Sequence, residues 1–190
     1  MTLFVGCALP AAKLAYDGLF KLLGDNPIEA LTYETGDWAM FFLMATLAIT
    51  PLRRLPGASR FISYRRMLGL FSFFYATVHC IIYFWLDKHG LLNDLAKRPF
   101  VLPGMAAFLL MIPLAFTSTN GWIRRLGKKW RVLHRLVYAI AVMAAFHYVW
   151  MRKTEAKPYM YAIVFAMLLC WRIGDRFIAN RRTQSSGLVS

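Results

Sequence analysis

Acidic residues and cysteines are both scarce in this chain of 190 residues. Nine Asp and Glu side chains stand against 23 Lys and Arg, which gives a formal net charge of +14 at pH 7. The three cysteines form no CxxC pair, and there is no Walker motif, GxGxxG or zinc-ligand spacing. The sequence therefore carries no sign of a nucleotide-binding fold or a structural zinc site. The scattered Cys7, Cys80 and Cys170 are best explained as small buried apolar side chains.

Apolar residues, in contrast, dominate the composition. They make up 59% of the chain, and the mean hydropathy is +0.47, more than a water-soluble domain of this size can bury. A helix needs about 17–25 apolar residues to cross roughly 30 Å of hydrocarbon. Six runs approach or reach this length: Leu3–Leu23, Gly36–Leu52, Met67–Leu86, Phe100–Phe116, Trp130–Met151 and Pro158–Trp171. The sequence predicts an all-α polytopic membrane protein, a bundle of six transmembrane helices forming one domain over residues 1–182, with a disordered polar tail over 183–190.

The first apolar run contains two charges near its middle. Lys13 and Asp17 are four residues apart, a spacing that lets them pair on one helical face. A secretory signal peptide is the alternative interpretation of this segment. The run lacks an early basic region and a small-residue cleavage site, which favours a spanning helix.

The positive charge follows the loops. A net charge this large would suggest nucleic-acid binding in a soluble protein, but here the bases cluster between apolar runs. The connection after the second run contains Arg53, Arg54, Arg60, Arg65 and Arg66, and the one after the fourth contains Arg124, Arg125, Lys128, Lys129 and Arg131, with no acidic residue in either. The connection after the first run is acidic instead, with Asp25, Glu29, Glu34 and Asp37. The positive-inside rule therefore predicts cytoplasmic basic loops, both termini in the cytoplasm, and membrane lipid rather than nucleic acid as the partner.

Three histidines lie inside apolar runs: His79, His134 and His147. An imidazole in hydrocarbon needs a partner, so each is a candidate functional residue. At 1.5 Å per residue, His79 lies about 20 Å above the cytoplasmic start of the third run, and His147 lies about 20 Å beyond His134, which is near the inner end of the fifth. His79 and His147 thus share a depth in the outer half of the membrane. Two parallel helices that offer imidazoles at one level predict bis-histidine ligation of a b-type haem.

His134 is a candidate ligand of a second haem near the cytoplasmic face. No other transmembrane histidine lies at its level, so its second ligand cannot be identified from the sequence. On a straight helix it lies about 140° around the axis from His147, so two haems would need different orientations or a local π-type distortion of the helix. Arg65, Arg66 and Arg135 share this depth, where they can bind haem propionates, a quinone head or a flavin phosphate. The alternative for Arg65 and Arg66 is anchoring in anionic lipid headgroups.

Other interpretations compete with an electron carrier. Membrane histidines also act as hydrogen-bonded struts between helices, and they serve proton relays in histidine-dependent, proton-coupled transporters. Interrupted helices and acidic residues near the midplane would favour a transporter. A scaffold without a cofactor would leave the depth match of His79 and His147 unexplained. His89, beside Lys88 and Gly90, is expected to be a solvated histidine in an outer loop.

Four stretches resemble the MsrQ family, formerly YedZ, which has a ferric reductase-like transmembrane domain. They are Ala48–Leu52, Arg65–Leu70 with Ala76–His79, Leu114–Thr119, and Leu126–Trp130 followed by His134 and His147-Tyr148. The resemblance covers nearly the whole chain and is weakest in the first run and the tail.

The resemblance implies the haem-binding membrane subunit of the methionine sulfoxide reductase system MsrPQ in the bacterial inner membrane. Such a subunit is itself a non-catalytic electron carrier. It passes electrons from the quinone pool, or from a cytoplasmic flavin reductase, to the periplasmic molybdopterin subunit MsrP, which repairs methionine sulfoxide in oxidised proteins. The family is associated with b haem, FMN and quinone, and its haem ligands fall on His79, His134 and His147. The fourth histidine of larger oxidases has no counterpart here, so one haem or two are expected.

Overall fold

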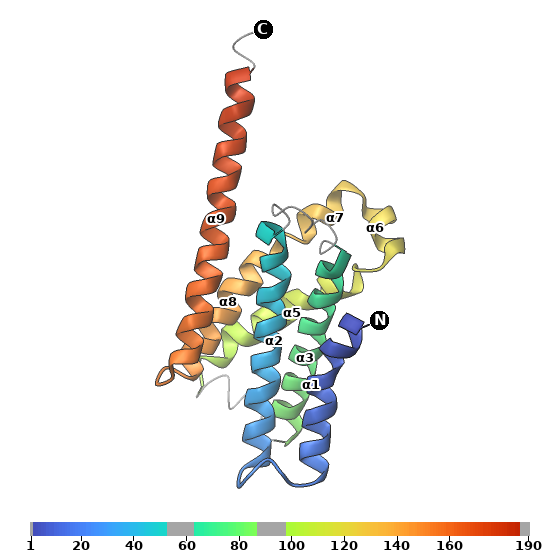
Figure 1. Cartoon of the computed structure of the whole chain (residues 1–190), viewed down its shortest axis with the longest axis vertical. Helices are drawn as coiled ribbons and strands as arrows, with labels where there is room; N and C mark the ends of the chain where they lie inside the picture. The colour runs from blue at the N-terminus through green and yellow to red at the C-terminus, as the bar shows by residue number, and fades with distance from the viewer. Residues whose placement is uncertain (1, 53–62, 87–97, 187–190) are drawn as a thin grey trace.

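The computed structural model describes residues 2–52, 63–86 and 98–186, with 176–186 described by their backbone alone (Figure 1). Its helices are α1 (Thr2–Leu19), α2 (Pro27–Leu52), α3 (Tyr64–Leu86), α5 (Val101–Phe116), α6 (Asn120–Leu126), α7 (Lys128–Leu133), α8 (Leu136–Met151) and α9 (Ala156–Ser186). No strand occurs within these ranges, so the all-α prediction is confirmed. His89 and residues 187–190 of the expected tail lie outside the described residues, whereas residues 183–186 continue α9 as helix.

Fewer helices than the predicted six are suited to crossing a membrane by length and composition. Four stretches qualify within the described residues: Pro27–Leu52, Tyr64–Trp85, Lys128–Met151 and Ala156–Asp175. The number rises to five if α5 and α6, which meet at 91°, form one broken span. The first apolar run does form a helix, α1, but it is not among them. Lys13, Asp17 and Pro10 dilute the apolar content of a helix of only 18 residues.

The predicted pairing within α1 is present. The Nζ of Lys13 donates to Oδ2 of Asp17 at 2.6 Å, one helical turn along the chain. The Lys13 side chain is 74% exposed, which places this pair on the outer surface of α1. An exposed pair of this kind contributes little to stability.

Helix α2 begins nine residues before the second apolar run. Proline suits the first position of a helix, and Pro27 occupies it here. The side chain of Asn26 accepts from the backbone N–H of Glu29 at 3.4 Å and donates to its carboxylate at 2.8 Å, which satisfies groups at the helix start. The prediction that Glu29 and Glu34 lie in a connection is therefore wrong, because both belong to α2, as does Asp37 at the edge of the second predicted run.

The fifth apolar run is interrupted. Helix α7 ends before His134 and α8 begins after Arg135. Across the break, the N–H groups of Val137 and Tyr138 donate to the carbonyls of His134 and Arg135, three residues back, at 3.4 and 3.1 Å. Bonds of this span locally replace the α-helical pattern, although Lys128–Met151 still forms one stretch long enough to cross a membrane. The run is thus distorted at His134, but by these tighter bonds and not by the predicted π-type distortion.

Helix α2 lies at the centre of the packing. It packs most extensively against α3, α5 packs most extensively against α8, and α9 covers both α8 and α2 (Figure 1). One apolar core joins α2 to α8 around Leu47, Ile140 and Ala141. A second joins α1, α2 and α3 around Cys7, Phe42, Phe71 and Tyr75. The phenol of Tyr75 donates to the carbonyl of Cys7 and accepts from the N–H of Ala11, both at 2.9 Å, which fastens α1 to α3.

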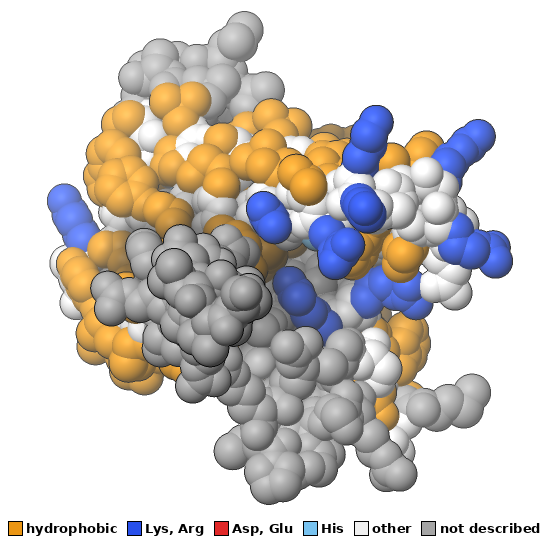
Figure 2. All heavy atoms as spheres, turned by 90° about the horizontal axis from the view of Figure 1, so that it is seen from above, with side chains coloured by type: hydrophobic (Ala, Val, Ile, Leu, Met, Phe, Trp, Pro, Cys, Tyr) orange, Lys and Arg blue, Asp and Glu red, His pale blue; other side chains and the backbone are white. Residues whose placement is uncertain are grey.

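The two ends of the bundle differ in charge. The C-terminal end of α2, the N-terminal end of α3 and helices α6 and α7 lie at one end, which we call the basic end (Figure 1). Figure 2 looks onto it and shows Lys and Arg side chains with no Asp or Glu in view among the described residues. Arg66 of α3 donates to the side chain of Asn120 at 2.6 Å, which joins the two basic segments. The α1–α2 connection and the α8–α9 turn lie at the opposite end.

Replacing Tyr75 with Phe tests how α1 is held. The substitution keeps the ring in the core but leaves the carbonyl of Cys7 and the N–H of Ala11 without the phenol. We expect the free energy of unfolding to fall by about 1 kcal/mol, measured by denaturant unfolding in detergent. A variant as stable as the wild type would show that these bonds do not hold α1.

Candidate functional site

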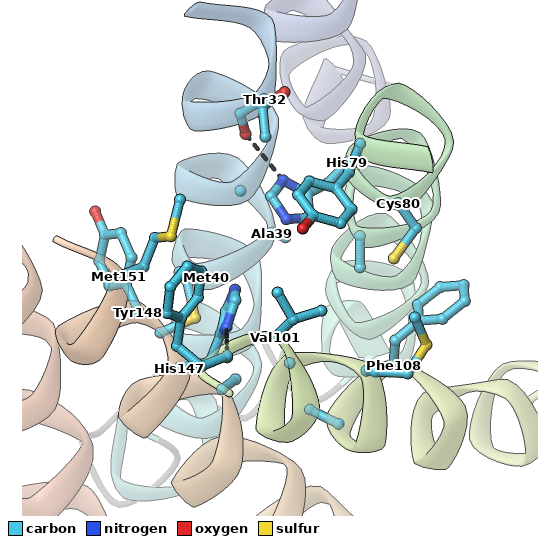
Figure 3. A pocket seen from close by; sticks show the side chains of 18 of the residues that line it. Thr32, Ala39, Met40, His79, Cys80, Val101, Phe108, His147, Tyr148 and Met151 are labelled. Carbon is cyan, nitrogen blue, oxygen red and sulfur yellow. Dashed lines mark hydrogen bonds between the residues drawn. The ribbon is translucent and has the colours of Figure 1, made fainter. Parts of the chain in front are cut away.

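His79 of α3 and His147 of α8 face one another across a space between the helices (Figure 3). Their ring centres are 6.5 Å apart, and the ring planes are inclined at 76°. Both residues lie in the C-terminal halves of helices that run away from the basic end. The sequence predicted that the two histidines lie at the same depth, and the structure places them next to each other.

Each of the two rings is held by a backbone carbonyl. The Nδ1 of His79 lies 2.9 Å from the carbonyl oxygen of Thr32 in α2, and the Nδ1 of His147 lies 2.6 Å from that of Phe100, just before α5. A carbonyl oxygen can only accept, so each Nδ1 carries the proton and each Nε2 keeps its lone pair. Metal-ligating histidines characteristically bond a carbonyl through the second ring nitrogen in this way.

Two glycines make room for the imidazoles. A Cβ atom added to Gly36 of α2 would lie 3.2 Å from Nδ1 of His79. One added to Gly104 of α5 would lie 2.8 Å from Nδ1 of His147, closer than real Cβ atoms approach. Each ring thus packs closely against the backbone of a neighbouring helix. Gly69, by contrast, faces Thr46 at 3.8 Å and serves only the contact between α3 and α2.

The space between the two histidines is a cavity enclosed by α2, α3, α5 and α8. The empty space among its lining residues is about 1070 Å³, including the part that opens to the surroundings. Its walls are almost wholly apolar or aromatic, with Met40, Val101, Phe108 and Met111 among them, and Arg152 lies at its rim. Such a lining suits an apolar ligand.

The geometry of the pair fits one metal ion held between two imidazoles. A metal–imidazole nitrogen bond is about 2.0–2.1 Å long, so two rings sharing one ion have centres about 6 Å apart. No group of three or more His, Cys, Asp or Glu gathers as a metal site within the described ranges. The pair therefore suits a metal whose remaining ligands come from a macrocycle. A haem meets this requirement together with the apolar lining.

His134 lies elsewhere. Its ring stacks on Trp130 with 3.9 Å between the centres, its Nδ1 is 3.1 Å from the carbonyl of Trp130, and its Nε2 is 3.5 Å from Oγ of Ser118. It does not line the cavity that contains His79 and His147, and thirteen residues place it about 20 Å from His147 along the helix axis. The structure thus separates His134 from the paired histidines, in agreement with its predicted level.

The three predicted arginines lie at the basic end, near His134 rather than near the paired histidines. Arg65 is half-buried and lies within electrostatic reach of the His134 ring. Arg66 is exposed and bonds Asn120, and Arg135 is exposed at the start of α8. They form a cationic surface beside His134, which suits either an anionic cofactor group or lipid headgroups.

One buried charged cluster near the cavity was not predicted from the sequence. Asp37 of α2, whose side chain is 10% exposed, accepts hydrogen bonds from Tyr148 of α8 and Lys157 of α9, and from Arg152 at 3.2 Å. The guanidinium of Arg152 also stacks over the ring of Tyr33, 4.6 Å from its centre. Counting Asp37 with the charges of the connection, at the very edge of the second apolar run, concealed this cluster. The available signal was the helix start formed by Asn26 and Pro27, which carries α2 past Asp37.

Comparisons with known proteins agree with this architecture. A family model described as "Ferric reductase like transmembrane component" matches residues 35–145, more than half of the chain. A protein-methionine-sulfoxide reductase heme-binding subunit MsrQ from Herminiimonas arsenicoxydans is 48% identical over 179 residues, which cover 90% of this chain and 82% of the relative. Proteins of the same name from Xanthomonas campestris pv. campestris (strain B100) and Xanthomonas euvesicatoria pv. vesicatoria (strain 85-10) are both 46% identical, and the matches cover 85% and 88% of this chain and 76% and 79% of the relatives. No solved structure matches the chain.

Replacing Gly104 with Ala tests the fit around His147. The new methyl group would displace the ring and break its bond to Phe100, so we expect haem binding to weaken about tenfold to hundredfold, as for other residues that orient a metal ligand. Haem content per protein after purification measures this. Gly6→Ala is the matched control, because nothing lies within 4 Å of a Cβ atom at that position. Equal haem content in both variants would contradict the assigned packing.

Proposed function

The chain belongs to the MsrQ family of ferric reductase-like transmembrane proteins, and we propose that it is the haem-binding membrane subunit of a protein-methionine-sulfoxide reductase. In this role it carries electrons from the quinone pool, or from a cytoplasmic flavin reductase, across the bacterial inner membrane. The acceptor is a periplasmic molybdopterin subunit that reduces methionine sulfoxide in oxidised proteins. The chain itself supplies the electron path and leaves substrate reduction to its partner.

The observation that carries this proposal is the facing pair His79 and His147. Their Nδ1 atoms are engaged by carbonyls, their Nε2 atoms are free to ligate, and their centres are 6.5 Å apart in an apolar cavity. A b-type haem bound there supplies reversible one-electron chemistry. The chain's residues hold the macrocycle, keep both ligands neutral and exclude water. Burial in the cavity and the two imidazoles would together set its reduction potential.

The charge asymmetry supports a direction for the electrons. With the basic end in the cytoplasm, as the positive-inside rule favours, both chain termini are cytoplasmic and the paired histidines lie in the outer half of the membrane. The cavity is then close to the periplasmic surface, where the acceptor subunit docks. An electron donor would then act at the basic end, and the acceptor subunit would dock beside His79 and His147, the residues that would hold the haem.

The entry site is proposed at the basic end, where Arg65 and His134 lie near each other. Arg65, Arg66 and Arg135 offer charge-assisted hydrogen bonds to a flavin phosphate, a quinone head or haem propionates. FMN and quinone are therefore both retained as ligands of this region. Ligation of a second haem by His134 stays a prediction.

A proton-coupled transporter is a weaker candidate. Its strongest support is Asp37, a buried carboxylate inside a helix. Arg152 and Lys157, however, come from the α8–α9 turn and the start of α9, so Asp37 lies near the end of the bundle rather than at its midplane.

Histidine substitutions test the haem assignment. We expect His79→Ala and His147→Ala each to abolish the same b-type signal in reduced-minus-oxidised absorption spectra of purified protein, because each removes an axial ligand. His134→Ala is the matched control and should retain that haem. If His134→Ala lowers the haem-to-protein ratio but keeps the b-type signal that depends on His79 and His147, then His134 binds a second haem. A full Soret band in His79→Ala or His147→Ala would contradict the proposal.

Reporter fusions test the orientation. We expect alkaline phosphatase inserted in the α8–α9 turn to be active, and the same enzyme fused after Ser190 to be inactive, because it folds only outside the cytoplasm. A green fluorescent protein fused after Ser190 should fluoresce. The reverse pattern would place the paired histidines in the cytoplasmic half of the membrane and contradict the direction of electron flow.

A further inference from the structure

Asp37 is the most heavily bonded buried carboxylate among the described residues, and binding a haem does not by itself require it. Its oxygens accept from the hydroxyl of Tyr148, from Nη1 of Arg152 at 3.2 and 3.4 Å, and from Nζ of Lys157. A buried charge is retained without neutralising only when such donors surround it. The side chain is thus fixed in place by groups from α8, the α8–α9 turn and α9.

The position of Asp37 connects it to both histidines. It directly follows Gly36, whose backbone packs on the ring of His79, and lies five residues after Thr32, whose carbonyl binds that ring. Its partner Tyr148 directly follows His147 and is 7% exposed. The bond between Asp37 and Tyr148 therefore joins the backbone segment that holds one imidazole to the segment that carries the other.

We propose that Asp37 and Tyr148 are positioning residues that set the relative placement of the His79 and His147 rings. Their bond fixes the rotation and height of α8 against α2, and so the 6.5 Å separation and the 76° inclination of the rings. Arg152 and Lys157 bind the Asp37 carboxylate and fix it where it can accept the hydrogen bond from Tyr148. This inference rests on the proposed function, because it concerns the two histidines that would hold the proposed haem, His79 and His147.

Electron paramagnetic resonance of the oxidised, haem-loaded protein tests the proposal. The g-values of a low-spin ferric haem with two imidazoles depend on the angle between the two ring planes. They report ligand geometry in the molecules that retain haem, whatever the yield. We expect Tyr148→Phe and Asp37→Ala to shift the largest g-value in the same direction and to displace the haem midpoint potential. Asp37→Asn, whose amide oxygen can still accept from Tyr148, should stay closer to the wild type.

Tyr75→Phe is the matched control, because it removes a buried, hydrogen-bonded phenol hydroxyl between α1 and α3, away from the cavity. It should lower stability and leave the g-values unchanged. Wild-type g-values and potential in both Tyr148→Phe and Asp37→Ala would overturn the inference and assign the cluster to stability alone. If Asp37→Ala does not accumulate, Tyr148→Phe decides the question, since it removes one hydroxyl.

The result also separates this inference from the function on which it rests. A wild-type protein without a low-spin, bis-imidazole signal would overturn the proposed function and this inference together. A wild-type signal with unaltered variants would overturn only the role of Asp37 and Tyr148.

Discussion

Two hydrogen bonds from histidine rings to backbone carbonyls are the interactions on which the site depends. Because a carbonyl of Thr32 or Phe100 can only accept, it selects the tautomer of His79 or His147 that presents a lone pair to the cavity. Both acceptors are uncharged backbone groups. In a low-dielectric setting, such bonds are also stronger than in water. Gly36 and Gly104 leave room for the two rings, and the apolar walls surround the space between them.

Helix α2 has a larger part in the site than its lack of a histidine suggests. Within six residues it supplies the carbonyl that orients His79, the glycine against which that ring packs, and the carboxylate bonded to the residue after His147. It also contributes to both apolar cores. One helix thus serves as the common reference for α3 and α8. This explains why two ligands from separate helices can meet with defined geometry.

Much of the site followed from simple arithmetic on the sequence. The helical rise put His79 and His147 at one depth, and the structure brings them together; the same rise put His134 about 20 Å away, and it lies apart. The basic loops predicted one charged end, and the basic segments that the structure describes meet there. Three features were not predicted from the sequence, because the prediction followed hydropathy and the local sequence signals pointed elsewhere. They are the early start of α2, the break at His134 with neither Pro nor Gly beside it, and the weak apolar content of α1.

The sequence by itself determined the all-helical class, the segregation of charge and the level of each histidine, because these depend on composition and on a constant rise per residue. Tertiary structure alone decided which carbonyls bind the imidazoles, that Gly36 and Gly104 lie against them, and that Asp37 meets Tyr148 across 111 residues of chain. Those contacts depend on the rotation of each helix about its axis. That rotation is set by packing against neighbouring helices, which no single run of sequence contains.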